Sequence, residues 1–337
     1  MYLSRDNHYV PQMYLKSWAV DERIKVYDLL VSSGNVPFWR ERNIKKTAFR
    51  TNLYIRVENG KEIDDFEHWF DQSFESPAAL PLYKICNDKK LEVNEWKALS
   101  EYIAAQYVRT LAFQQNSTEL YLNIVPGILE ELTNKMANIT TIPPLNEDEK
   151  SISKLLPLDF KVVDKEYDET HVLAEISTII GKSSWLFSIK HLLDNNSCFL
   201  KVMRNMKWSI VKSHPSVSWP TSDNPVAICR RIGDRLVKTT GIVNKGVMVL
   251  MPVNPHTALI GKYRNRMDYK ISANIDFSQE IKKMIVTNAW LQIYSDIEDD
   301  EVKILRPRVV DVDEFKRIKE EYGNWFEAYK EHEGSLL

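Results

Sequence analysis

The sequence predicts an α+β protein in which a helical middle lobe packs on a mixed or antiparallel β-sheet lobe formed largely by the C-terminal half. Apolar residues recur at helical spacing over about 61–195, whereas short β-type runs separated by turn residues follow over about 196–310. N-terminal strands are expected to join the second lobe. We therefore expect one two-lobed domain over 1–310, followed by a C-terminal helix and tail over 311–337.

The N-terminal elements are expected to be short. Pro11 fixes its own φ and pushes the preceding residue out of the α region, so a helix is expected only over about Gln12–Trp18. Alternating apolar residues predict strands over 23–29 and 52–57.

The middle of the chain has helical periodicity. An aromatic face predicts a helix from residue 63 that is broken at Pro77, and an apolar stripe over 92–115 gives the strongest prediction of a helix. The next helix is expected to begin at about residue 118. The charged residues 160–170 resemble a loop, and residues 171–193 are expected to be helical.

The C-terminal third is expected to alternate strands and helices. A helix over 277–289, a strand over 291–294 and a last helix over 313–329 follow a series of β-type runs. The runs are 198–203, 208–212, 226–230, 236–239 and 247–251.

Composition limits the class of protein. A chain of 337 residues that is 44% hydrophobic can form a substantial core, yet no apolar run is long enough to span a membrane. The three widely spaced cysteines indicate a reducing compartment and neither a disulfide framework nor a zinc site. We expect a cytoplasmic protein that does not associate with membranes.

The net charge of −2 conceals a basic segment. Residues 201–270 contain thirteen basic and three acidic side chains, a net charge of +10. This segment predicts an anionic partner, either a nucleic acid or a nucleotide. The alternative is that the lysines and arginines only solvate strand faces and protect sheet edges.

Familiar catalytic signatures are absent from the sequence, including phosphate-binding glycine loops, paired metal-ligand histidines and nucleophile elbows. One remaining candidate is the N-terminal motif with His8, Tyr9 and Gln12. A histidine near its ordinary pKa can act as a general base or hold an anion. Alternatively, His8 only anchors the terminus.

A second candidate lies in the long middle helix. Gln106 and Arg109 are three residues apart and share a helix face. An arginine in an apolar helix is expensive to bury without a partner. It needs a carboxylate, for which Glu75 is favoured, or a phosphate that it binds through its forked guanidinium group.

A third candidate is the loop between Pro220 and Pro225. It contains Ser222, Asp223 and Asn224 directly before a predicted strand, and rigid loops on sheets commonly carry catalytic carboxylates. The alternative is a turn that only starts the strand.

These motifs, together with Pro252, Pro255 and Asn288, resemble the bacterial family called domain of unknown function 4238, over about residues 6–295. The chain departs from the family pattern at Leu111, where proline is frequent, which leaves the local helix end open. The resemblance supplies no substrate. It implies that six polar residues converge: His8, Gln12, Arg109, Asp223, Asn224 and Asn288.

Two functional classes follow. The first is a phosphodiester or nucleotide hydrolase, a nuclease-like effector in phage defence or a toxin system. His8 would be its acid or base, Arg109 would clamp phosphate, and Asp223 would orient His8 or hold a divalent metal, the one candidate cofactor. Substrate would be positioned by Tyr9, Gln12, Gln106, Ser222, Asn224 and Asn288. The second class is a non-catalytic sensor that binds a nucleotide or a protein, in which the same residues form a structural polar cluster.

Overall fold

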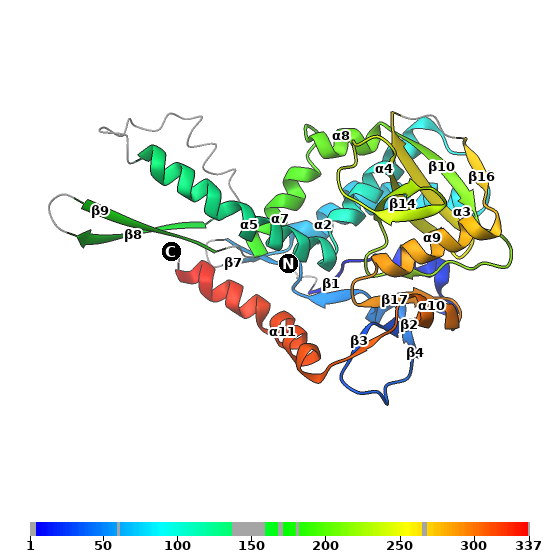
Figure 1. Ribbon diagram of the computed structural model, residues 1–337, viewed down its shortest axis with the longest axis horizontal. Helices are drawn as coiled ribbons and strands as arrows, with labels where there is room; N and C mark the ends of the chain where they lie inside the picture. The colour runs from blue at the N-terminus through cyan, green and yellow to red at the C-terminus, as the bar shows by residue number, and fades with distance from the viewer. Residues whose placement is uncertain are drawn as a thin grey trace. The chain divides into compact units, whose positions relative to one another are not determined.

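The computed structural model describes residues 5–58, 61–136, 159–167, 171–179, 182–264 and 268–335. The chain divides into two compact units, one formed by Met1–Ala112 with Leu192–Leu337 and the other by Phe113–His191. The fold is mixed α+β, as predicted, with a helical segment in the middle of the chain and a large sheet in the C-terminal half (Figure 1). The domain boundaries expected from the sequence stay a prediction.

The larger sheet has six strands in the order β13-β12-β14-β15-β10-β16. Its strands are antiparallel except for β16, which runs parallel to β10, so the sheet is mixed. The strands are β10 (Met206–Lys212), β12 (Ala227–Ile232), β13 (Arg235–Lys238), β14 (Val247–Asn254), β15 (Thr257–Tyr263) and β16 (Lys270–Ser272).

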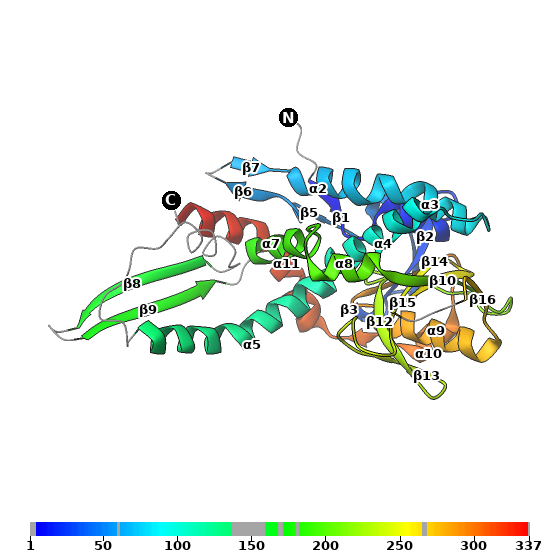
Figure 2. The same cartoon turned by 90° about the horizontal axis from the view of Figure 1, so that it is seen from above.

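Helices cover both faces of this sheet (Figure 2). On one face, α9 (Ile275–Asn288) buries Ile281 and Ile285 against Val211 and Leu250 of the strands. The other face carries Trp208, whose indole donates to Ser100 of α4 (Val93–Val108) at 2.8 Å. Side chains alternate along a strand, so a sheet that is apolar on both faces needs a helical layer on each.

A second sheet joins strands from the two ends of the chain. Its order is β11-β17-β2-β4 and all its pairs are antiparallel. Its strands are β11 (Thr221–Ser222), β17 (Gln292–Ser295), β2 (Arg23–Asp28) and β4 (Trp39–Asn43). The strands expected at 23–29 and 291–294 are therefore confirmed, and they are neighbours.

Short elements complete this unit. The N-terminal strand β1 (Asp6–His8) pairs with β5 (Phe49–Thr51), and β3 (Leu30–Val31) pairs with β18 (Val309–Val310). The expected helix at 12–18 is present as α1 (Gln12–Leu15) and a 3₁₀ turn, Lys16–Trp18. Other elements are the 3₁₀ turn Ile44–Lys46, the hairpin β6 (Arg56–Glu58) and β7 (Lys61–Ile63), α10 (Asp300–Leu305) and the expected last helix, α11 (Val312–Ser335).

The predicted break at Pro77 is wrong. α2 (Asp65–Phe70) continues through a π-helical turn, Asp71–Glu75, into α3 (Ser76–Cys86). Pro77 closely follows the π-helical turn, in which hydrogen bonds join residues five apart, so the helix continues without the N–H group that proline lacks.

Two other boundaries in this unit also differ from the prediction. The long middle helix ends at Val108, where Arg109 caps it, and α5 (Leu111–Met136) begins at once. The run 198–203, expected to be a strand, is the helix α8 (Cys198–Arg204). Its N-terminus is capped by Ser197, whose Oγ accepts from the backbone N–H of Leu200 at 3.0 Å.

The unit Phe113–His191 contains most of α5, a β-hairpin and α7 (Lys182–Leu192). The hairpin strands β8 (Asp159–Tyr167) and β9 (His171–Ile179) pair along their full length. The loop expected at 160–170 and the helix expected from 171 are therefore wrong in these residues. A β-ladder satisfies backbone groups whatever the side-chain charge, so charged composition alone does not indicate a loop.

Among the helices described, none has the length and apolar character required to cross a membrane.

Candidate functional site

The N-terminal motif is held by backbone bonds. His8 pairs with Phe49 across the β1–β5 ladder, and the N–H groups of Tyr9 and Val10 both donate to the carbonyl of Ala48, at 3.0 and 3.4 Å. Pro11 has φ −60° and ψ 142°, so it turns the chain out of the strand and allows α1 to begin at Gln12. Gln12 is half-buried at the start of that helix.

Arg109 is buried with every arm of its guanidinium group bonded. Nη1 pairs with Glu75 Oε1 at 2.5 Å, Nη2 donates to the carbonyl of His8 at 2.5 Å, and Nε donates to the hydroxyl of Tyr54 at 3.4 Å. The guanidinium carbon also lies 4.3 Å from the ring centre of Phe70. The predicted partner, Glu75, is confirmed, and it comes from the π-helical turn.

His8 and Gln106 contact this cluster differently. The ring of His8 lies beside Phe49, with the ring centres 5.7 Å apart, and its Nε2 has no hydrogen-bond partner among the described residues. Burial lowers the pKa of His8, and the charge of Arg109 lowers it further, so the imidazole is neutral near pH 7. Gln106 donates through Nε2 to the carbonyl of Tyr9 at 2.9 Å.

Asp223 accepts hydrogen bonds from the backbone of a segment that is distant in the sequence. Its carboxylate accepts three N–H groups at the junction between α9 and β17, from Trp290 at 2.7 Å, Leu291 at 2.6 Å and Gln292 at 3.0 Å. Burial raises the pKa of Asp223 to about 6, although the three backbone bonds favour the ionised form.

Asn224 and Asn288 bond each other's backbone. Nδ2 of Asn224 donates to the carbonyl of Asn288 at 2.9 Å, and Nδ2 of Asn288 donates to the carbonyl of Asn224 at 2.7 Å. Ser222 Oγ accepts from the N–H of Asn224 at 3.2 Å. We call Asp223, Asn224, Asn288 and the backbone of 290–292 the Asp223 latch, because together they fasten a loop to the end of a helix.

The predicted residues thus form two clusters, one around Arg109 with His8, Tyr9 and Gln106, and the other the Asp223 latch with Ser222. The N-terminal segment bridges them. Tyr14 of α1 bonds Thr221 of β11, with 2.7 Å between their hydroxyl oxygens, and the hydroxyl of Tyr9 bonds that of Tyr294 in β17.

A cavity of about 320 Å³ opens beside this bridge. We call it the Tyr9 pocket. Its lining includes the polar residues Tyr9, Asp28 and Gln292 and the aromatic rings of Phe49 and Phe315. Four basic side chains line it as well: Arg42, Lys46, Arg50 and Lys319. His8, Arg109 and Asp223 are not part of this lining.

The basic lining was not predicted. The sequence offers one signal for it, a run of five basic residues with a single acid over 40–50, which the more basic segment 201–270 obscures. Within the part of the chain that the structure describes, no three His, Cys, Asp or Glu side chains are grouped so that they could hold a metal ion.

Comparison with known proteins gives one match. The family described as "Protein of unknown function (DUF4238)" matches residues 6–299, in agreement with the resemblance of the motifs. No curated protein and no solved structure matches the chain.

Proposed function

Since the chain belongs to DUF4238, a family of proteins of unknown function, we propose its function from its own residues: it binds a nucleotide in the Tyr9 pocket. The observation that carries this proposal is the charge of the lining. Four basic side chains from β4, the 3₁₀ turn, β5 and α11 surround the cavity. The one acid, Asp28, already pairs with Arg40 and accepts from Gln292 Nε2 at 2.8 Å.

Size and shape also favour a nucleotide. A cavity of about 320 Å³ lies within the range of small-molecule sites. The rings of Phe49 and Phe315 offer faces for a planar base, and the lysines and arginines offer donors for phosphate oxygens.

The contacts of the predicted catalytic residues favour binding over hydrolysis. The donors of Arg109 and the acceptors of Asp223 form hydrogen bonds within the protein, so neither side chain is available to bind a substrate. The hydrolase is the second candidate, because the neutral imidazole of His8 has the protonation state of a base. Its Nε2 has no partner among the described residues but is buried, so a substrate would reach it only after a local rearrangement.

Titration calorimetry with nucleoside mono- and diphosphates and with inorganic phosphate tests the proposal. We expect Lys46→Glu and Arg42→Glu each to weaken nucleotide binding at least 10-fold, because each reverses a charge in the lining. The matched control is Lys45→Glu, since Lys45 adjoins Lys46 but does not line the pocket, and its side chain makes an exposed ion pair with Glu22.

The proposal fails if the wild type binds none of these ligands at millimolar concentration, or if Lys45→Glu weakens binding as much as Lys46→Glu. Product analysis in the same mixtures, with and without divalent metal, decides the second candidate. Turnover that disappears in His8→Ala would favour the hydrolase.

A further inference from the structure

A second and larger cavity, of about 640 Å³, lies between α4 and β10. We call it the Trp208 groove. Three aromatic and three basic side chains line it: Trp96, Trp208, Tyr269, Lys97, Arg204 and Lys207. Trp96 and Tyr269 meet edge to face, with their ring centres 6.0 Å apart, and Tyr269 is 43% exposed. Three aromatic groups therefore line one open groove.

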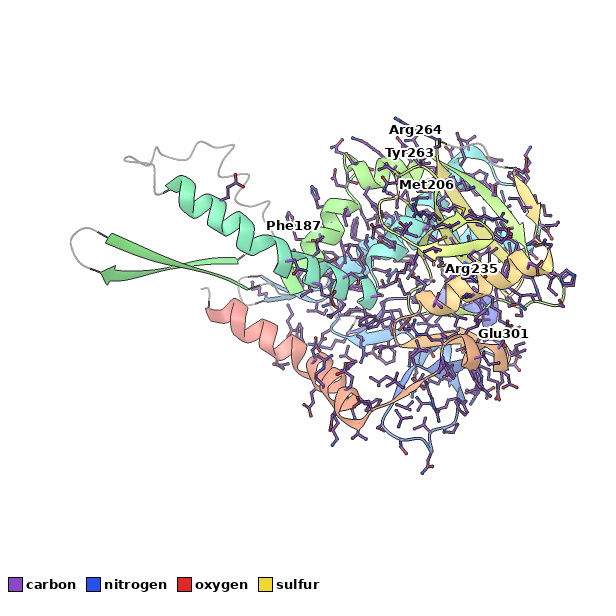
Figure 3. The ribbon with its side chains drawn as sticks, viewed as in Figure 1. Phe187, Met206, Arg235, Tyr263, Arg264 and Glu301 are labelled. Atoms are coloured by element: carbon purple, nitrogen blue, oxygen red, sulfur yellow. The ribbon has the colours of Figure 1, made fainter. Side chains whose placement is uncertain are left out.

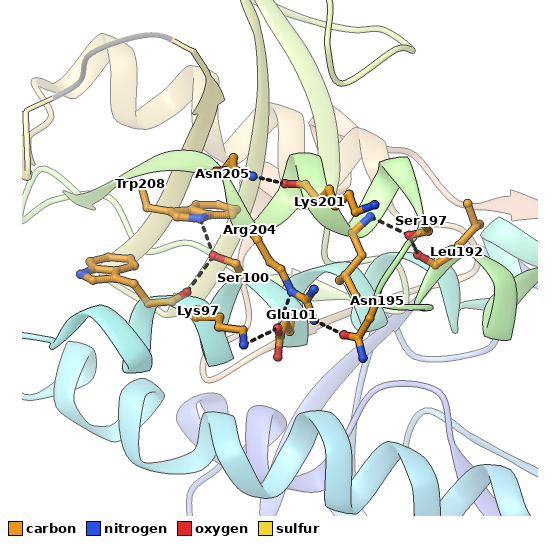
Figure 4. A network of polar contacts seen from close by, with 12 residues as sticks. Lys97, Ser100, Glu101, Leu192, Asn195, Ser197, Lys201, Arg204, Asn205 and Trp208 are labelled. Atoms are coloured by element: carbon orange, nitrogen blue, oxygen red, sulfur yellow. Dashed lines mark hydrogen bonds and ion pairs between the residues drawn. The ribbon is translucent and has the colours of Figure 1, made fainter.

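Trp208 is fixed before any ligand arrives. Its indole Nε1 donates to Ser100 Oγ at 2.8 Å, and that hydroxyl donates to the carbonyl of Trp96 at 2.7 Å (Figure 4). Gly261 lies against the ring, so closely that a Cβ there would be 2.7 Å from Cζ3 of Trp208. Trp208 is only 8% exposed, so it forms a rigid support beside the more exposed ring of Tyr269.

Positive charge predominates around these rings. Arg204 and Lys207 flank Met206, the first residue of β10, which pairs with Tyr263, next to Arg264 (Figure 3). Arg204 and Lys97 share one acid, Glu101, at 2.5 and 3.9 Å (Figure 4). Lys97, Arg204 and Lys207 therefore give the groove three basic groups, and its described lining contains no acidic residue.

We propose that the Trp208 groove binds a short stretch of single-stranded nucleic acid. Unpaired bases present the flat faces that stack on Trp96 and Tyr269, beside the buried ring of Trp208, and phosphates carry the charge that complements Lys97 and Lys207. A duplex keeps its base faces stacked inside the helix, so it does not offer them to the aromatic rings. The groove shares no residue with the Tyr9 pocket, so this proposal does not depend on nucleotide binding there.

The groove also gives the basic segment a definite site. Arg204 and Lys207 come from residues 201–270, whereas Trp96 and Lys97 come from α4, more than one hundred positions earlier. Basic residues spread over a strand face would serve solubility alone, but basic residues around fixed aromatic rings are typical of single-strand binding.

Fluorescence anisotropy with labelled ten-nucleotide DNA and RNA strands tests the proposal on the full chain. We expect binding at 50 mM salt that weakens steeply as salt rises, because phosphate contacts release counterions. Trp96→Ala should weaken binding about 10-fold through lost stacking, and Lys207→Glu should reduce the salt dependence as well. Tryptophan fluorescence should be quenched on binding in the wild type, and less so in Trp96→Ala.

The matched control is Lys245→Glu, which makes the same charge change in the same basic segment but in the exposed loop between β13 and β14, outside the groove. Circular dichroism establishes that each variant is folded. Because Lys207 is exposed, Lys207→Glu should fold and still tests the proposal if Trp96→Ala unfolds. The proposal is overturned if the wild type does not bind either strand at 100 µM protein. It is also overturned if Lys245→Glu weakens binding as much as Lys207→Glu. The same conclusion follows if an acidic peptide displaces the labelled oligonucleotides and duplex DNA binds as tightly as they do.

Discussion

At the scale of single residues, one guanidinium group holds three segments of the chain together. Arg109 ends α4, pairs with Glu75 of the π-helical turn, and holds the carbonyl of His8 in the N-terminal strand. Its side chain is 1% exposed, whereas that of Glu75 is 19% exposed. Removing one partner of such a pair destabilises the fold more than replacing both, because a charge left alone in the interior is poorly solvated.

A double-mutant cycle measures this pairing. We expect Arg109→Met to reduce the free energy of unfolding by about 3–5 kcal/mol, because Glu75 and the carbonyl of His8 lose their donors. Glu75→Gln should cost less, since Gln keeps an oxygen acceptor. Urea denaturation of both single variants and the double variant gives the coupling energy. If the two effects simply add, the pair is not coupled and Arg109 acts through packing alone.

The sequence was informative about Arg109 and less so about Asp223, for a physical reason. A buried arginine demands an anionic partner, and few carboxylates on a neighbouring helix were available, so Glu75 was predictable. Asp223 binds the N–H groups of Trp290, Leu291 and Gln292, and a backbone donor leaves no signature in the amino-acid sequence.

At the scale of elements, the predictions hold where the periodicity of apolar residues is strong. They fail where a local feature, such as a helix cap or a π-helical turn, determines the structure. The strand β2 and the helix α9 follow their patterns. The helix α8 depends on one serine cap, and the continuity of α2 into α3 depends on a π-helical turn. The residues of β8 and β9 pair along their full length, and neither sequence taken alone indicates this pairing. The Tyr9 pocket was missed because β4, β5 and α11 meet there only after folding.

The Asp223 latch determines how α9 connects to β17. We expect Asp223→Ala to lower the free energy of unfolding by about 2–4 kcal/mol, because three N–H groups lose one acceptor. Asp223→Asn should cost less, since one oxygen remains. Leu291 and Gln292 line the Tyr9 pocket, so both variants should also bind nucleotides more weakly.

Chemical denaturation and calorimetry on the same samples check both effects of the latch. A fully stable Asp223→Ala variant would contradict the structural role. Its normal nucleotide affinity would show that the latch and the pocket are independent.

At the scale of the whole molecule, global stability should depend on pH through Glu67. Burial raises the pKa of this carboxyl group to about 7, and the charges of Glu75 and Asp64 add to the effect. Arg109 and the side chain of Asn7 oppose it. The folded state therefore binds a proton more tightly than the unfolded state does, and its stabilising effect is full below about pH 4.5 and lost as pH rises through about 7.

We expect the free energy of unfolding contributed by this group to fall by about 1–3 kcal/mol between pH 4.5 and 7.5. Glu67→Gln stays neutral at every pH, so the difference in unfolding free energy between wild type and variant should change over this window. Urea titrations at several pH values provide the measurement. A difference that stays constant with pH would place the pKa of Glu67 outside the window.

The bonds of the N-terminal segment also determine when the protein can finish folding during its synthesis. Tyr14 bonds Thr221 and the carbonyl of Pro252, and Trp18 donates to the carbonyl of Trp219, across separations of 207, 238 and 201 residues. A ribosome adds about 5–20 residues per second, so these aromatic side chains wait roughly 10–50 seconds for their partners. During that time, they are apolar surface that a chaperone can bind. Slower translation should lengthen this exposure.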